Sequence, residues 1–297
     1  MNHTNHPMFS HIHTALQRGR RWLEGLPLEL MNRTAAGRAV LRDLEYGAQQ
    51  RQTLDLYLHP VPSATRGTVL FVHGGYWDSG DKGDYPFMAD ALLDMGFNAA
   101  LMNYRLAPQS IFPAYVEDAA LALRWLRENL QNHGQDGSRV VMLGHSAGAH
   151  ITALVCCTPK YVEKVGGSRE WIAGAVGMSG PYDFLDWIPG DARMRRGFGP
   201  PDTWLETQPV LVADGRNPPM LLLHGSKDDV ATPMHAPVLR DAIVKRGGRA
   251  EYRWYPRLNH YTMVGTFSKL LRWLEPDAFK DVQRFFEACL AERAARD

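Results

Sequence analysis

The pentapeptide G-H-S-A-G at residues 144–148 constrains the fold of this chain more than any other stretch. The apolar, β-branched run 139–143 before it predicts a buried strand, and the run 149–157 after it, which lacks Pro and Gly, predicts a helix. A G-x-S-x-G turn joins a strand to a helix in this way, and its glycines let the two elements cross closely. A motif this short also arises by chance in such a chain, with a probability on the order of 0.1. An ordinary strand-to-helix turn is therefore the alternative to be tested against the rest of the sequence.

Apolar runs alternate with amphipathic segments along most of the chain. The run at 68–73 is almost continuously apolar, which is typical of a parallel strand buried on both faces. Further strands are predicted at 97–102, 139–143, 172–179, 220–224 and 251–255, and helices at 86–95, 113–131, 149–157, 233–246 and 277–293. Repeated β-α units indicate an α/β fold with a mostly parallel central sheet and helices on both faces.

The first part of the chain departs from this alternation. Residues 40–46 and 53–59 alternate apolar and polar side chains, which predicts a pair of antiparallel strands at one edge of the sheet. Residues 9–25 carry Ile12, Leu16 and Leu23 at roughly helical spacing, which predicts an amphipathic helix. We therefore expect an N-terminal helical extension over residues 1–30 and one main domain over residues 31–297.

Residues 181–219 form the one long irregular segment of the main domain. The segment is rich in Pro, Gly and Asp, and it contains Phe184, Trp187, Phe198 and Trp204. A loop of this length within a compact domain is usually functional, so a lid or a substrate-facing loop is one interpretation. The alternative is a surface excursion whose aromatic side chains pack onto the body of the protein.

Composition excludes several classes of protein. The net charge is +1 and there is no long block of like charge, so nothing indicates a nucleic-acid surface. Three cysteines, two of them adjacent, fit buried thiols in a reducing compartment. The N-terminus has no continuous apolar region of a signal peptide, and no apolar run is long enough to span a membrane. These features predict a cytoplasmic protein that acts away from membranes. The histidines near the N-terminus lack a carboxylate or Cys that would complete a ligand set, so we expect no metal.

Nucleophilic chemistry at Ser146 would require a base, which in turn requires an orienting acid. In strand-turn-helix serine sites the three groups follow in the order Ser, acid, His. His260 follows the last predicted strand, where a loop can present it over the sheet edge, and we predict that it is the base. Three other histidines follow Ser146 and are less suitable as the base. His150 lies one helical turn past the serine, on the helix after it, and His224 is expected to brace the acid turn. His235 opens a helix soon after the acid candidates, too early to follow a full α-β unit.

The acid is expected in the turn that follows the strand at 220–224. Asp228 lies three residues beyond the glycine of this turn, which suits a carboxylate that returns towards His260. Asp229 is the second candidate and Asp183 a distant third. Ordinary turn chemistry would also explain an Asp pair here. The position between nucleophile and base favours a catalytic role for one of them.

A tetrahedral intermediate would also require hydrogen-bond donors for its oxyanion. The sequence H-G-G-Y-W at residues 73–77 follows the first buried strand. Its two glycines allow the backbone to turn N–H groups inward, where they would act together with the N–H of Ala147.

These residues resemble the α/β-hydrolase superfamily, from about residue 53 to the C-terminus. More narrowly, the chain resembles the group that contains hormone-sensitive-lipase-like esterases and kynurenine formamidases. The run Y-R-L-A-P at 104–108 is similar to the esterases, as is F-P-A at 112–114 followed by Asp118, whereas H-G-G-Y-W is similar to the H-G-G-x-W motif of the formamidases. The resemblance implies the triad Ser146, Asp228 and His260, and the oxyanion donors Gly75, Tyr76 and Ala147.

The expected function is that of a cofactor-independent serine hydrolase acting on small carboxylic esters. The alternative is an arylformamidase acting on a formamide such as N-formylkynurenine, and a remote one is a non-catalytic receptor on a hydrolase fold. Four aromatic residues are predicted to wall the substrate pocket: Trp77, Phe184, Trp187 and Trp204. The sequence leaves the substrate and the oligomeric state undetermined.

Overall fold

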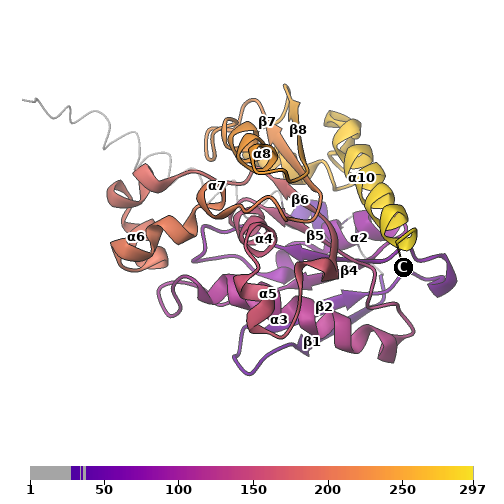
Figure 1. Cartoon of the computed structure of the whole chain (residues 1–297). Coiled ribbons are helices and arrows are strands. Elements are labelled where there is room, and N and C mark those ends of the chain that lie inside the picture. Colours follow the sequence, from indigo (N-terminus) through magenta and orange to yellow (C-terminus); the bar gives the residue numbers. More distant parts are fainter. Residues whose placement is uncertain (1–27, 34, 36–37, 297) are drawn as a thin grey trace, which may run out of the picture.

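A computed structural model describes residues 28–33, 35 and 38–296 of the chain. Its centre is an eight-stranded sheet with the strand order β1-β2-β4-β3-β5-β6-β7-β8 (Figure 1). The strands are β1 (Val40–Glu45), β2 (Thr53–Tyr57), β3 (Thr68–Val72), β4 (Asn98–Met102), β5 (Val140–His145), β6 (Ile172–Met178), β7 (Met220–Gly225) and β8 (Ala250–Tyr255). β2 pairs antiparallel with both β1 and β4, and the pairings from β4 to β8 are all parallel.

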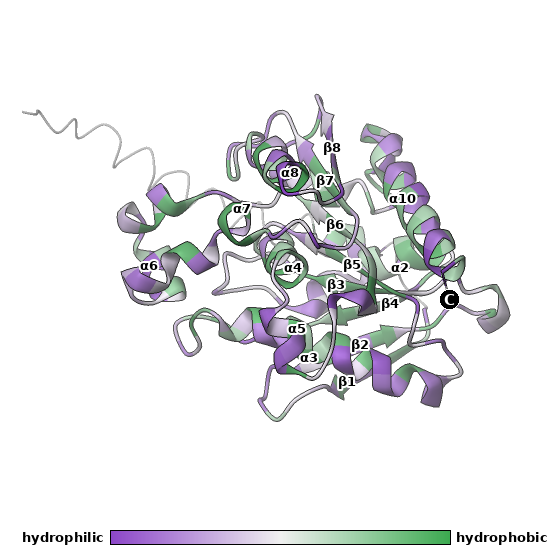
Figure 2. Ribbon diagram, viewed as in Figure 1, coloured by the Kyte–Doolittle hydropathy of each residue, from purple (hydrophilic) through white to green (hydrophobic). Residues whose placement is uncertain are grey.

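Helices cover both faces of the sheet. On one face lie α3 (Ala114–Asn129), α4 (Ala147–Cys157), α5 (Lys160–Lys164) and α8 (His235–Lys245). On the other face lie α2 (Pro86–Asp94) and the C-terminal α10 (Pro276–Ala294). Figure 2 shows the difference between a central helix and a surface helix: α4 is largely hydrophobic, whereas hydrophobic and hydrophilic residues alternate along α10. This alternation leaves a single apolar stripe on α10, as expected for a helix with one face in water.

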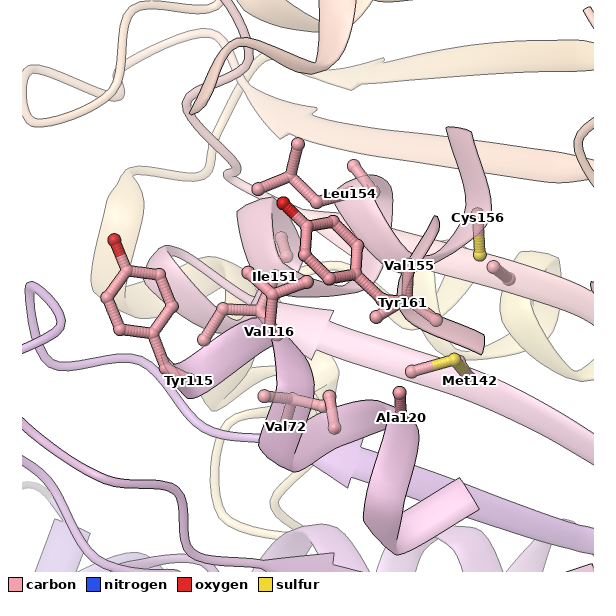
Figure 3. Close-up of a cluster of buried hydrophobic side chains, with 14 of the residues drawn as sticks. Val72, Tyr115, Val116, Ala120, Met142, Ile151, Leu154, Val155, Cys156 and Tyr161 are labelled. Carbon is pink, nitrogen blue, oxygen red and sulfur yellow. The ribbon is translucent and has the colours of Figure 1, made fainter. Parts of the chain in front are cut away.

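Strand β3 shows why the sheet is buried on both sides. Leu70 and Val72 point into the core cluster shared with α3 and α4, and Val69 and Phe71 point into the opposite cluster with α2 and α10. Figure 3 shows Val72 and Met142 beneath Ile151 of α4 and Val116 of α3. Each such apolar side chain stabilises the fold by about 1.5–3 kcal/mol when it is removed from water. The predicted central position of this strand is therefore confirmed.

The predicted alternation of strands and helices is confirmed from β3 to α10, with boundaries that move by a few residues. The edge strands β1 and β2 pair antiparallel as expected. The predicted helix at 9–25 lies outside the described residues. All three cysteines are buried thiols. Within the described part of the chain, every helix is too short or too polar to cross a membrane.

The segment 181–219, here called the insertion, differs from the irregular loop that its composition suggested. It contains a series of short helices: η5 (Leu185–Gly190), α6 (Ala192–Phe198), η6 (Pro201–Thr207) and α7 (Pro209–Val212). The carboxylate of Asp191 caps α6 by accepting from the N–H groups of Arg193 and Met194. Short helices of this kind escape periodicity analysis because one or two turns do not establish a period.

Candidate active site

The turn at Ser146 is a sharp junction between β5 and α4. Ser146 has φ of 54°, a left-handed conformation that is uncommon for residues other than glycine. Close packing explains the flanking glycines: a Cβ on Gly144 would lie 2.3 Å from the carbonyl oxygen of Gly148, and one on Gly148 would lie 2.0 Å from that of Val72. The backbone N–H of Ser146 donates to the carbonyl of Met178 on β6, 2.9 Å away. The serine is thus held at the carboxyl edge of the sheet, half-buried, at the start of a helix.

Three predicted side chains form one hydrogen-bonded chain at this edge. The Oγ of Ser146 lies 2.9 Å from Nε2 of His260, and Nδ1 of His260 lies 3.0 and 3.1 Å from the carboxylate oxygens of Asp228. A carboxylate can only accept, so Nδ1 of His260 carries the proton and Nε2 is free to accept from the serine hydroxyl. This is the tautomer that a general base requires.

Asp228 lies in the turn after β7 and is almost completely buried. Burial alone raises the pKa of its carboxyl, but hydrogen bonds from His224 and His260 outweigh burial and hold the pKa well below its usual range. The N–H groups of Val230 and Ala231 also donate to its Oδ1, at 3.0 and 2.9 Å. His224 lies against the same carboxylate, with Nε2 3.2 Å from Oδ2, which matches its expected bracing position. The carboxylate is therefore ionised and fixed in orientation.

His260 occupies a different local structure from the loop that was predicted. It is the first residue of helix α9 (His260–Gly265), and Asn259 caps this helix by accepting from the N–H groups of Tyr261 and Thr262. The carbonyl of His260 accepts from Nε2 of His145, 3.0 Å away. Sequence reasoning assigned no role to His145, although its place beside Ser146 in the pentapeptide was a signal that could have drawn attention to it. The capped helix and the bond from His145 fix the backbone of His260.

The other candidates from the sequence lie elsewhere. Asp229 and Asp183 are exposed, and neither contacts His260 among the bonds of the described residues. His235 accepts from the N–H of Asp183 at 3.3 Å and packs against the ring of Trp187. His150 is fully buried beneath the insertion. The geometry therefore brings together the first choices for base and acid.

The segment 73–77, here called the glycine turn, lies directly against Ser146. A Cβ on Gly74 would stand 3.1 Å from Cβ of Ser146. The next three residues, Gly75, Tyr76 and Trp77, have positive φ angles of 128°, 57° and 62°. His73 stabilises the turn, because its Nδ1 donates to the carbonyl of Gly74 at 2.6 Å. Burial lowers the pKa of His73 to about 4.

Ala147 is the first residue of α4, beside the same serine. The first N–H groups of a helix have no partner within the helix, and the helix dipole makes this end attractive to negative charge. A developing oxyanion near Ser146 would therefore meet donors from both the helix end and the glycine turn.

The four predicted pocket aromatics fall into two groups. Trp77 and Phe184 are 2% and 1% exposed and stack on each other at 5.6 Å. Trp187 and Trp204 are partly exposed, and the Nε1 of Trp204 donates to the carbonyl of Gly199 at 3.0 Å. Trp77 and Phe184 therefore belong to the packed interior, and Trp187 and Trp204 remain partly accessible on the insertion.

Buried His150 joins the glycine turn to the insertion. Trp77 Nε1 donates to Nδ1 of His150 at 3.1 Å, and Nε2 of His150 lies 2.7 Å from the carbonyl of Thr207. Burial lowers the pKa of His150 to about 4, so the ring is neutral and can accept at one nitrogen while it donates at the other.

Among the residues that the structure describes, no group of three or more His, Cys, Asp or Glu side chains is arranged to hold a metal ion.

Comparison with known proteins gives a consistent result. A model of the BD-FAE family matches residues 54–243, which is more than half of the chain. An isoprenylcysteine alpha-carbonyl methylesterase of Arabidopsis thaliana is 29% identical over 242 residues, which cover 74% of this chain and 56% of the relative. Esterase LipC of Mycobacterium tuberculosis is 28% identical over 206 residues, covering 64% and 51% of the two chains. The chain thus spans little more than half the length of the curated relatives that it matches.

Solved structures share the fold. A truncated carbohydrate esterase from gut microbiota superposes with a TM-score of 0.73 at 20% identity, covering 85% of this chain and 96% of the other. The propionate-bound esterase Est2 of Thermogutta terrifontis gives a TM-score of 0.67 at 22% identity, with coverage of 84% and 94%. With the mostly parallel sheet between two helical layers, these similarities confirm the expected α/β-hydrolase fold.

Proposed function

This chain belongs to the BD-FAE family, and we propose that it hydrolyses small carboxylic esters through an acyl-enzyme on Ser146. The observation that carries the proposal is the chain of hydrogen bonds from Ser146 through His260 to Asp228. Such a chain converts a weak hydroxyl nucleophile into one that can attack an acyl carbon. The relatives described above bear the names of esterases, which supports the same reaction class.

In the first half of the reaction Ser146 Oγ bonds to the acyl carbon while Nε2 of His260 takes the hydroxyl proton. The tetrahedral intermediate then collapses: the bond to the alcohol oxygen breaks, and His260 returns the proton to that oxygen. In the second half a water molecule adds to the acyl-enzyme, again losing its proton to His260, and the carboxylic acid leaves as Ser146 regains its proton. Asp228 stays ionised throughout and stabilises the imidazolium that forms twice in the cycle.

We assign the oxyanion donors to the backbone N–H groups of Gly75, Tyr76 and Ala147. Support comes from the contact between the glycine turn and Ser146, and from the position of Ala147 at the start of α4. Preorganised donors of this kind contribute about 3–4 kcal/mol each to stabilising the transition state.

The substrate-facing part of the site is proposed to be the insertion within a catalytic domain that spans residues 31–297. Partly exposed Trp187 and Trp204 would contact the leaving group or acyl chain, and buried Trp77 and Phe184 would support them from beneath. The arylformamide alternative shares the same machinery, but the relatives described above do not favour it.

A fluorophosphonate tests the proposal directly because it phosphonylates an activated serine. We expect one adduct per chain by intact-mass spectrometry, located at Ser146 and absent from Ser146→Ala. Ser146→Ala should also reduce kcat on p-nitrophenyl butyrate by several orders of magnitude. Ser63→Ala, a matched change at an exposed serine, should leave labelling and kcat unchanged.

An unlabelled Ser146 in folded protein would contradict the proposal and favour a non-catalytic receptor. A kcat/KM for N-formylkynurenine orders of magnitude above that for every p-nitrophenyl ester of a chain-length series would replace the ester substrate with a formamide.

A further inference from the structure

Helix α6 of the insertion contacts the glycine turn through a compact polar network. The hydroxyl of Tyr76 donates to Oδ2 of Asp191 at 2.6 Å. Arg193 donates from Nε and Nη2 to the two carboxylate oxygens of Asp78, at 2.7 and 2.5 Å. Its guanidinium also stacks over the Tyr76 ring, 4.4 Å from the ring centre. Two residues of the insertion therefore hold Tyr76 of the glycine turn and Asp78, which directly follows the turn, each across 115 positions of sequence.

The backbone at this point needs external support. Tyr76 and Trp77 are consecutive residues other than glycine with φ of 57° and 62°. Each such conformation costs about 1–3 kcal/mol relative to an ordinary backbone conformation. It persists only where the surrounding structure holds it in place. The direction of the Tyr76 N–H follows from this conformation, because the peptide unit is planar and rotates as one body.

The insertion also supports the neighbouring residue, Trp77. Trp77 is held through His150, which in turn contacts the carbonyl of Thr207 in η6. Thr207 and Asp191 both belong to the insertion, so the insertion contacts Tyr76 directly and Trp77 through His150. By contrast, the backbone of Ser146 bonds to the sheet and to α4: its N–H donates to the carbonyl of Met178, and its own carbonyl accepts from the N–H groups of Ala149 and His150.

Charge in the network is partly compensated. The hydrogen bond with Asp78 raises the pKa of Arg193, and the hydroxyl of Tyr76 helps to keep Asp191 ionised although burial opposes it. Two carboxylates close to a developing oxyanion would be unfavourable, and the guanidinium between them offsets one of these charges.

We propose that Asp191 and Arg193 are positioning residues that hold the glycine turn, through Tyr76 and Asp78, with its N–H groups directed at the oxyanion. This role rests on the proposed esterase function. The insertion thereby acts as a brace for the reaction centre in addition to facing the substrate.

The test uses the full chain with two variants, Tyr76→Phe and Arg193→Ala. Tyr76→Phe removes only the hydroxyl that reaches Asp191, and Arg193→Ala removes the bidentate pair and the stacked cation. Arg196→Ala on the same helix is the matched control, because Arg196 is exposed. Fluorophosphonate titration gives the concentration of competent sites, so kcat is expressed per titrated serine.

We expect kcat per titrated site on p-nitrophenyl butyrate to fall about tenfold in both variants, with KM within about twofold of the parent. The inhibition constant of a trifluoromethyl ketone, which forms an oxyanion on the serine, should rise by a similar factor. Arg196→Ala should match the parent in all three measurements. Thermal unfolding of each variant shows that the comparison is made on folded protein.

Asp191→Asn supplies a further variant that preserves the cap of α6, since Asn is also a favourable capping residue. It should lower kcat in the same manner. The inference is overturned if kcat per titrated site and trifluoromethyl ketone affinity stay within about twofold of the parent in all three variants, or if KM alone changes. Failure of the parent protein to label at Ser146 would instead overturn the proposed function.

Discussion

The two halves of the candidate site are built in different ways. Ser146 directly follows β5, and Asp228 and His260 lie three and five residues beyond the ends of β7 and β8, so the strand ends of the sheet set their positions. The insertion stands on this edge as a series of short helices; Figure 1 shows α6 at the side of the molecule opposite α10. It is joined to the glycine turn by side chains, among them His150, Asp191 and Arg193.

This difference indicates which part of the site depends on the fold alone and which part depends on individual side chains. Strand ends in a parallel sheet are fixed by ladders of backbone hydrogen bonds, which tolerate many sequences. Side-chain bridges depend on individual residues, so they can differ between related proteins. The substrate that the insertion accepts can differ with them. Changes to the sheet-derived half are therefore expected to lower activity more than changes to the insertion.

The largest effect is expected at the acid turn of the sheet-derived half. Asp228→Asn should lower kcat on p-nitrophenyl butyrate by about 10³–10⁴-fold, because an amide favours the wrong tautomer of His260. Its exposed neighbour supplies the matched control: Asp229→Asn should stay within about twofold of the parent. A reversal of these two results would transfer the acid role to Asp229.

The next effect concerns the bridge between the two halves. His150→Ala removes the acceptor for Trp77 Nε1 and the donor to the Thr207 carbonyl, and it leaves a cavity among packed aromatic rings. The free energy of unfolding in urea should fall by about 2–4 kcal/mol. An unchanged unfolding free energy would show that the insertion is held without this bridge.

The buried histidines of the two halves make the free energy of unfolding depend on pH. Burial lowers the folded-state pKa of four of them: His73 to about 4, His145 to about 3, His150 to about 4 and His235 to about 4, from an ordinary value of 6.5. Below pH 6.5 the unfolded chain binds protons that the folded chain does not. The free energy of unfolding should therefore fall as the pH falls from 6.5 towards 4, by about 1.4 kcal/mol per pH unit for each histidine.

Urea unfolding at pH 7, 6 and 5 measures this slope. His235→Gln removes one titrating ring from the side of the insertion, so the slope should decrease by about one proton. A parent protein with the same stability at pH 7 and pH 5 would contradict the neutral burial of these rings.

The smallest effect is expected at the accessible surface of the insertion. Trp204→Ala should raise KM for p-nitrophenyl butyrate about fivefold, equivalent to about 1 kcal/mol of apolar contact, with kcat unchanged. Trp273→Ala changes a tryptophan outside the insertion that is 73% exposed, and it should leave both constants unchanged. Equal kinetics for both variants and the parent would remove Trp204 from the proposed substrate contacts.

Much of the fold was predictable because its signals are local. The apolar run at 68–73 and the strand-turn-helix pattern at 139–157 each carry their structure in neighbouring residues. The chain order of Ser146, Asp228 and His260 narrowed the candidates for the reaction centre, since each follows a predicted strand. The short helices of the insertion and the helical setting of His260 were missed, because one or two turns leave no periodic pattern and capping at Asn259 depends on local geometry.

Hydrophobic periodicity and the conformational freedom of glycine predicted the order of strands and helices, the burial of the central strands and the residues at their carboxyl ends. The packing of the folded chain set which distant side chains meet: His145 with the backbone of His260, His150 with Trp77, and Tyr76 with Asp191. Contacts across such separations depend on how a whole sheet and an insertion pack together, and no local pattern encodes that packing.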